Sequence, residues 1–144
     1  MTAPRIVLDT NVLIASIGTR SPYRWIFDSI RNGRLGLCVS DMILFEYQDV
    51  IARKTTRSIA ENVVNFITIN PTTELIQTYF NFGMIASDPA DNKFVDCAIA
   101  AGADHLVSND RHFQILKRID FPKVDIITVK EFEAAYRERL APEQ

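Results

Sequence analysis

Short apolar runs alternate with amphipathic, helix-like segments along almost the whole chain. This alternation constrains the fold most, because a strand that returns to its sheet through a helix makes a right-handed parallel crossover, and the helices then cover both faces of the sheet. The expected strands are residues 5–9, 35–40, 105–108 and 124–129, with a shorter one at 74–78. The sequence therefore predicts a three-layer α/β/α domain around a central, mostly parallel four- to five-stranded sheet.

Helix-start and helix-stop signals mark the segments between these strands. Helices are expected over residues 12–18, 22–33, 41–54, 55–67, 88–102 and 130–140. Ser40 is expected to cap the helix at 41–54, and Asp88, followed by Pro89, the helix at 88–102. Thr128 and Glu131 form a capping-box pattern before the last helix. Residues 79–87 stay open between helix and strand, because a short apolar run does not distinguish the two.

The composition sets the class of protein. With 144 residues, 47% of them apolar and 24% charged, the chain fits one soluble globular domain over residues 1–144. A net charge of −2 argues against a non-specific nucleic-acid coat protein, but not against an enzyme that handles nucleic acid through metal ions. Cys38 and Cys97 lie in apolar runs, as core thiols of a reducing cytosol would. The sequence shows neither a signal peptide nor a membrane-length apolar run, so a cytoplasmic location is expected.

Two aspartates follow expected strands. Asp9 ends the first strand in RIVLDTNVLI, and Asp110 lies two residues after the strand at 105–108. The carboxyl ends of parallel strands meet at one edge of the sheet, where such sheets bind their ligands, so both side chains are expected there. Asp9 has two readings at this point. It is either a turn or helix-capping residue, or a carboxylate delivered to a site.

Two further acids are expected at the same edge. Glu46 falls between Ile43 and Val50 on the apolar stripe of its helix, where a residue that serves only solubility would not lie. Asp96 is surrounded by apolar residues in FVDCAIAAGA, and a buried charge without a partner destabilises a protein strongly. Lys93 is expected to point elsewhere. Four acids without a paired base therefore predict a divalent metal site.

At this point the sequence resembles the PIN domain family, and in particular its bacterial VapC-like branch, which is often assigned to toxin–antitoxin systems. The resemblance covers nearly the whole chain. It rests on LDTNVLI at the first strand, Glu46 in the third helix, DNKFVDCAIAAGAD and HLVSNDRHF, in this order and on the matching elements. Each motif alone is weak, whereas their combination is specific.

The resemblance implies a ribonuclease that depends on Mg²⁺ or Mn²⁺ and hydrolyses RNA to products with a 5′-phosphate and a 3′-hydroxyl. The catalytic and metal-binding positions of the family match Asp9, Glu46, Asp96 and Asp110. Glu46 would either bind a second ion or hold a water ligand, and Asn11 and Ser108 match the small polar positions that orient the acids. Oxygen ligands suit these hard ions, and a water bound to such an ion is a stronger acid than bulk water.

The resemblance also implies partners. These are an RNA substrate, a cognate antitoxin protein and a second copy of the chain in a homodimer. Phe132, Tyr136 and Leu140, near the C-terminus, could form the seam of such a homodimer or pack within their own chain.

Several residues keep a structural reading beside the functional one. Asp91 either joins the site or stabilises the start of its helix through the helix dipole. Asn11 either caps a helix or orients an acid, and Ser108 could simply end its strand. Arg111 and His112 could touch a phosphate or lie exposed in a loop.

Two other functions compete with the ribonuclease. A phosphatase of the haloacid dehalogenase class also begins with a strand that delivers an aspartate, but it needs a second aspartate two residues later, where this chain has Asn11. The other alternative is a catalytically silent PIN module that binds a partner. The presence of all four acids argues against it.

Overall fold

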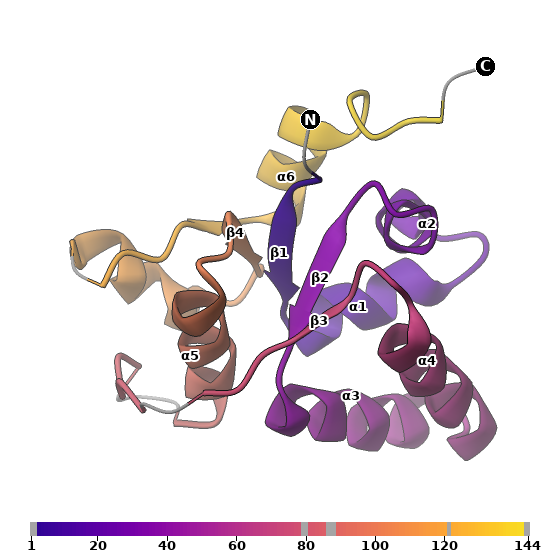
Figure 1. Cartoon of the computed structure of the whole chain (residues 1–144), viewed down its shortest axis with the longest axis horizontal. Coiled ribbons are helices and arrows are strands. Elements are labelled where there is room, and N and C mark those ends of the chain that lie inside the picture. Colours follow the sequence, from indigo (N-terminus) through magenta and orange to yellow (C-terminus); the bar gives the residue numbers. More distant parts are fainter. Residues whose placement is uncertain (1–2, 79–80, 86–88, 121, 143–144) are drawn as a thin grey trace.

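The computed structural model describes residues 3–78, 81–85, 89–120 and 122–142, and a five-stranded sheet forms its centre (Figure 1). The strand order is β3-β2-β1-β4-β5, and every neighbouring pair is parallel. The strands are β1 (Arg5–Leu8), β2 (Gly36–Val39), β3 (Glu74–Leu75), β4 (His105–Val107) and β5 (Ile126–Ile127). The predicted fold class is therefore confirmed, with each expected strand present.

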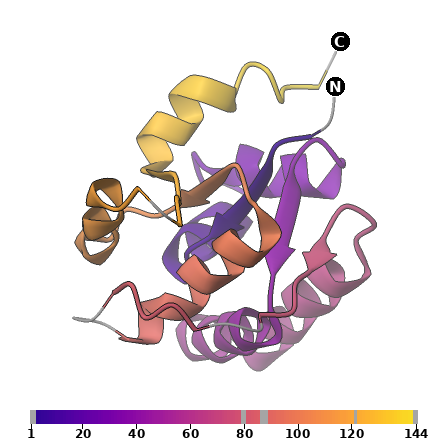
Figure 2. The same ribbon diagram turned by 60° about the vertical axis from the view of Figure 1, so that its left-hand side comes forward.

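Helices cover both faces of this sheet. They are α1 (Thr10–Ile17), α2 (Arg24–Arg31), α3 (Asp41–Lys54), α4 (Arg57–Ile69), α5 (Asn92–Ala101) and α6 (Val129–Tyr136), with two 3₁₀ helices, η1 (Pro89–Asp91) and η2 (Arg111–Arg118). In Figure 1, α5 lies in front of the sheet and α1 behind it, and α3 and α4 pack side by side. Figure 2 shows these layers after a turn of 60°. The sequence did not predict η2, which follows Asp110 directly.

Local capping signals explain where several helices begin and end. The Ser40 hydroxyl accepts a hydrogen bond at 3.3 Å from the backbone N–H three residues later, and Thr128 and Glu131 form the predicted capping box. Gly102 ends α5 with a φ of 61°, a left-handed conformation that favours glycine. The predicted cap Asp88 lies outside the described residues. The helix expected from 88 onward instead opens with η1, a tighter turn, before α5.

The central strands are buried up to their carboxyl ends. Leu8, Val39 and Val107, the last residues of β1, β2 and β4, are at most 1% exposed. The polar residues that follow them therefore start from rigid positions. Cys38 and Cys97 are fully buried, as predicted. Burial raises the pKa of their thiols to about 11 and about 12, so both stay protonated and unreactive at neutral pH.

The buried face of α3 differs from the predicted one. Its fully buried residues are Ile43, Tyr47 and Ile51, whereas Val50 is only half-buried. The Tyr47 hydroxyl donates a hydrogen bond of 2.6 Å to the Leu8 carbonyl at the end of β1. This contact holds the first half of α3, and with it Glu46, beside the carboxyl edge of the sheet.

The C-terminal apolar residues pack within their own chain. Phe132 is fully buried, Leu140 is 7% exposed, and Tyr136 packs against the same core. Trp25 of α2 stacks on Phe132 with ring centroids 5.3 Å apart. The intramolecular reading of these residues is therefore the correct one. Across the described part of the chain, no helix is both long enough and apolar enough to cross a membrane.

Candidate active site

Asp9 lies directly after β1, and its carboxylate is held by a side chain that follows the neighbouring strand β4. Asp9 occupies the N-cap position of α1, yet among the described residues its side chain accepts no capping hydrogen bond. Its Oδ2 instead accepts a hydrogen bond of 2.8 Å from the hydroxyl of Ser108, which is fully buried after β4. The Ser108 Oγ in turn accepts the backbone N–H of Asp110 at 3.0 Å. Ser108 thus fixes the Asp9 carboxylate relative to the start of the Asp110 turn.

The electrostatics of Asp9 show which acids share its surroundings. Asp9 is 7% exposed, and burial is the main cause that raises its pKa above the ordinary aspartate value. The carboxylates of Asp110 and Glu46 raise this pKa further, while the hydrogen bonds from Ser108 and the Thr10 backbone oppose the increase. The structure therefore brings three of the four predicted acids into one electrostatic neighbourhood.

A cavity of about 300 Å³ opens beside this group. Asp9, Asn11, Tyr23, Asn109 and Asp110 supply its polar lining. Asn11 lines this cavity, and its Oδ1 accepts a hydrogen bond of 3.1 Å from Lys54. The cavity gives water or a ligand access to the carboxyl ends of β1 and β4.

Glu46 approaches Asp9 from α3, but it has a basic partner. One carboxylate oxygen accepts a short hydrogen bond from the Thr10 hydroxyl, and the other lies 2.7 Å from the Lys93 ammonium nitrogen. The prediction that Lys93 points elsewhere is therefore wrong. Lys93 lies one residue into α5, and its flexible stem reaches across to α3.

Asp96 is buried as the sequence suggested, at 5% exposure, and among the described residues it does not belong to the group of close ligand atoms formed by Asp91, Asp110 and His112. Its Oδ1 accepts the backbone N–H of Phe82 at 3.1 Å. Burial raises its pKa, and within the described part of the chain the other site acids add nothing to that shift. Asp96 lines a second cavity, of about 350 Å³, together with Lys93.

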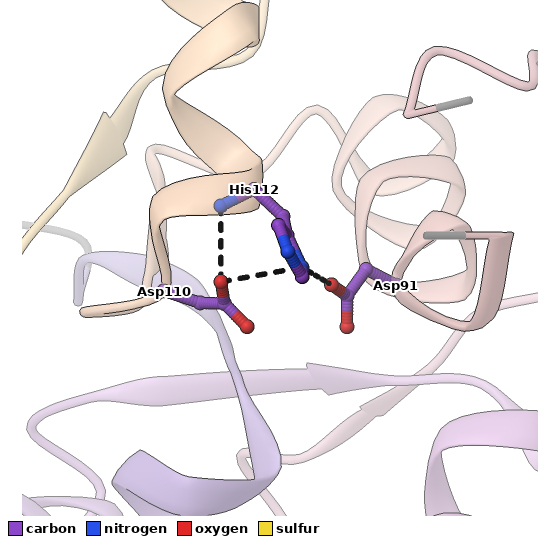
Figure 3. A group of neighbouring side chains, drawn as sticks. All are labelled: Asp91, Asp110 and His112. Atoms are coloured by element: carbon purple, nitrogen blue, oxygen red, sulfur yellow. Dashed lines mark hydrogen bonds and ion pairs between the residues drawn. The ribbon is translucent and has the colours of Figure 1, made fainter. Parts of the chain in front are cut away.

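Asp91, for which the sequence left a site role and a helix-dipole role open, lies close to Asp110 and His112. The ring of His112 lies between the carboxylates of Asp91 and Asp110 (Figure 3), with its Nδ1 3.4 Å from an oxygen of each. The His112 backbone N–H also donates to Asp110 at 2.9 Å. One ligand atom from each of the three residues lies within 4.8 Å of the others. Asp91 comes from η1 and Asp110 from the start of η2, so two 3₁₀ turns bring them together.

These donors fit a divalent ion of the Mg²⁺ or Mn²⁺ type. Asp91 and Asp110 offer oxygen ligands, the buried Asp9 lies next to Asp110, and His112 adds an imidazole nitrogen that Mn²⁺ tolerates better than Mg²⁺. The sequence did not predict that His112 lies between Asp91 and Asp110, because no sequence pattern distinguishes an exposed histidine of this kind from one that contacts two acids. Arg111 is exposed, as its structural reading expected.

Comparison with known proteins gives a family match and fold matches. The model of a PIN domain family matches residues 5–112. Among solved structures, VapBC2 from Rickettsia felis bound to a DNA fragment from its promoter is 19% identical, with a TM-score of 0.59 over 86% of this chain and 98% of that one. DNA-bound VapBC from Salmonella typhimurium is 19% identical, with a TM-score of 0.54 over 87% and 98%.

A third structure, the PIN domain endonuclease Utp24, is 14% identical, with a TM-score of 0.50 over 87% of this chain and 84% of that one. At these identities the likenesses establish the fold. A search of curated proteins finds no match.

Proposed function

Because this chain belongs to the PIN domain family, we propose that it is a metal-dependent endoribonuclease that hydrolyses RNA phosphodiester bonds with Mg²⁺ or Mn²⁺. Because the chain belongs to this family, the alternative function as a phosphatase of the haloacid dehalogenase class is excluded. The observation that carries the proposal is the carboxylate of Asp9, which is buried and held by the hydroxyl of Ser108, whose Oγ also accepts the backbone N–H of Asp110. A carboxylate that served only as a helix cap would need no hydrogen bond from the end of β4.

The metal ligands we propose are Asp9, Asp110 and Asp91, with His112 at the open side of the group. Such an ion supplies positive charge to the scissile phosphate and an acidified water as nucleophile. The chain's own residues do the positioning. Ser108 locks the Asp9 carboxylate, and the backbone N–H of His112 holds the Asp110 carboxylate toward Asp91.

Asp96 has a different part in this proposal. Its hydrogen bond to the Phe82 backbone ties the segment before η1 to α5, close in sequence to Asp91. We therefore assign Asp96 a positioning role and assign its predicted metal-binding role to Asp91. Glu46 stays at the border of the site through Thr10 and Lys93.

Similarity to the two VapBC structures supports a narrower proposal, that this chain is the toxin component of a toxin–antitoxin pair with a cognate antitoxin protein. A homodimer and a cytoplasmic location belong to the same proposal. Growth arrest on expression of the wild type, absent for Asp9→Asn, would support a toxin. Unimpaired growth with soluble, RNA-cleaving wild type would contradict it.

The catalytic proposal is tested by incubating a structured RNA with the purified protein in Mn²⁺ and in EDTA. We expect cleavage only with metal, products with a 5′-phosphate and a 3′-hydroxyl, and a loss on the order of 1,000-fold in Asp9→Asn, since a principal ligand is removed. Arg5→Met, altered at the opposite edge of the sheet, is the matched control and should cleave normally. Equal activity of wild type and Asp9→Asn, or none in any condition, would favour a catalytically silent PIN module.

A further inference from the structure

Lys93 is a largely buried cation inside an acidic site. Its side chain is 14% exposed, and its ammonium nitrogen lies 2.7 Å from Glu46 and 2.6 Å from the Ala90 carbonyl. The stem passes near the Phe94 ring, with the nitrogen 5.5 Å from the ring centroid. A lysine used only for solubility would extend into water, so these contacts define a fixed position for the charge.

This charge pairs with Glu46, which lies outside the Asp91–Asp110–His112 group. Both carboxylate oxygens of Glu46 are engaged, one by Lys93 and the other by Thr10. An ion at Glu46 would have to displace the ammonium group and take over its contact with the carboxylate. Asp9 is held by the Ser108 hydroxyl, and Asp110 lies 3.4 Å from the His112 Nδ1, so the contacts of these two acids differ from the lysine contact of Glu46.

Lys93 also stands between two hollows. It lines the cavity of about 350 Å³ that contains Asp96 and a shallower groove of about 510 Å³ along α3, with Met42 and Phe45 exposed on its wall. A chain that follows this surface toward Asp9 would pass the ammonium group. Lysine binds phosphate as a compact point charge.

We propose that Lys93 takes the place of a second metal ion at Glu46, so that the site binds one divalent ion and uses the ammonium group as its second positive charge toward the RNA phosphate. This inference rests on the proposed nuclease function. In two-metal sites, a pair of ions flanks the scissile phosphate and neutralises its charge on both sides. Here one of those two charges would be built into the chain.

The inference is tested without RNA by counting bound Mn²⁺ ions, from the loss of the free-ion signal in electron paramagnetic resonance. We expect one ion per chain in wild type and in Lys93→Arg, which keeps the charge. Lys93→Gln should bind two, because Glu46 becomes available. The double variant Lys93→Gln/Glu46→Gln should return to one. If Lys93→Gln is too unstable to titrate, wild type and Lys93→Arg still give the deciding count.

Two ions in wild type would overturn the inference, and so would a single ion in folded Lys93→Gln. With RNA, kcat of the double variant Lys93→Gln/Glu46→Gln, which lacks both the ammonium group and the second ion, should fall on the order of 100-fold, while KM changes less, because the charge acts on the reacting phosphate. The proposed function can fail separately. If wild type binds one ion, shows the expected count in each variant and cleaves no RNA, the charge replacement stands and the nuclease proposal does not.

Discussion

The amino and carboxyl ends of the central strands differ in how their charged side chains are paired. At the amino end of β1, Arg5 donates to both oxygens of Glu74, at 2.9 Å for one of them, and to the Ala101 carbonyl at 2.8 Å. At the amino end of β4, His105 lies 2.8 Å from Asp125. Beyond the carboxyl ends, Asp110 adds to the charge around Asp9 and shares the His112 imidazole with Asp91, while Lys93 pairs with Glu46.

This difference separates stability from function within one sheet. The amino end pairs acids with bases, which makes folding easier and offers little to a ligand. The carboxyl end keeps carboxylates together, and their repulsion costs folding free energy unless a cation joins them. The second arrangement is the one that we expect to serve metal binding.

The largest expected effect distinguishes two acids only five residues apart. Asp91→Asn should lower kcat for RNA on the order of 100-fold, because it removes a carboxylate from the group with Asp110 and His112. Asp96→Asn should lower it less than about tenfold, since its amide oxygen can still accept the Phe82 N–H. The rates of RNA cleavage by the two variants at saturating Mn²⁺ show which of the two acids contributes more. A larger loss in Asp96→Asn would restore Asp96 as the ligand.

This pair of acids also shows what the sequence could and could not predict. The apolar strands locate Asp9 and Asp110, because whatever follows a buried parallel strand emerges at its carboxyl end. Helical spacing cannot choose between Asp91 and Asp96. The choice depends on the 3₁₀ turn η1, which changes the direction of the chain just before α5.

Long side chains set a second limit to prediction from sequence. Lys93 contacts Glu46, which is 47 positions away in the chain. Because the lysine side chain is long and flexible, no periodic sequence pattern indicates which distant residue it contacts. By contrast, the Thr128–Glu131 capping box is local, with both partners within one helical turn, and it was predicted correctly. Hydrogen bonds within one helical turn can be predicted from a single sequence, whereas side-chain contacts between two different helices or strands cannot.

A substitution at the amino ends of the strands should lower the stability of the protein and leave its RNA cleavage unchanged. Arg5→Met removes the contacts to Glu74 and Ala101 and should lower the free energy of unfolding by about 1 kcal/mol, a modest value because the pair is partly exposed to solvent. This corresponds to a decrease in Tm of roughly 4 °C. Thermal melting checks the expected loss of stability, and kcat measured on the same preparation checks that RNA cleavage is unchanged. A loss of kcat in a folded sample would mean that the two edges are coupled.

A pH series tests the repulsion at the carboxyl edge. Burial and neighbouring carboxylates raise the pKa of Asp9 in the folded protein, so the folded state holds this proton more tightly than the unfolded chain does. The contribution to stability is therefore fully present below the unfolded pKa of about 4 and is lost as pH rises through the higher folded value. Without metal, Asp9→Asn should be more stable than wild type at pH 7.

That advantage should shrink as the pH falls and should be gone below about 4, where Asp9 becomes protonated in the unfolded state as well. Urea unfolding in EDTA at several pH values measures it. Ser108→Ala is a useful companion, because it removes the hydrogen bond to Asp9 but leaves the charge. A stability difference between wild type and Asp9→Asn that does not change with pH would place its origin outside the ionisation of Asp9.

The most direct test of the carboxyl-edge account is a set of four melting curves, for wild type and Asp9→Asn, each in EDTA and in Mn²⁺. In EDTA, Asp9→Asn should melt higher by a few degrees, because one repelling charge is gone. An ion that binds only the folded state adds about 1.4 kcal/mol at ten times Kd, again a few degrees for this size of domain. Mn²⁺ should therefore raise wild type above the variant, which gains little. If the two proteins melt alike with and without Mn²⁺, Asp9 is a turn residue and the carboxyl edge is no metal site.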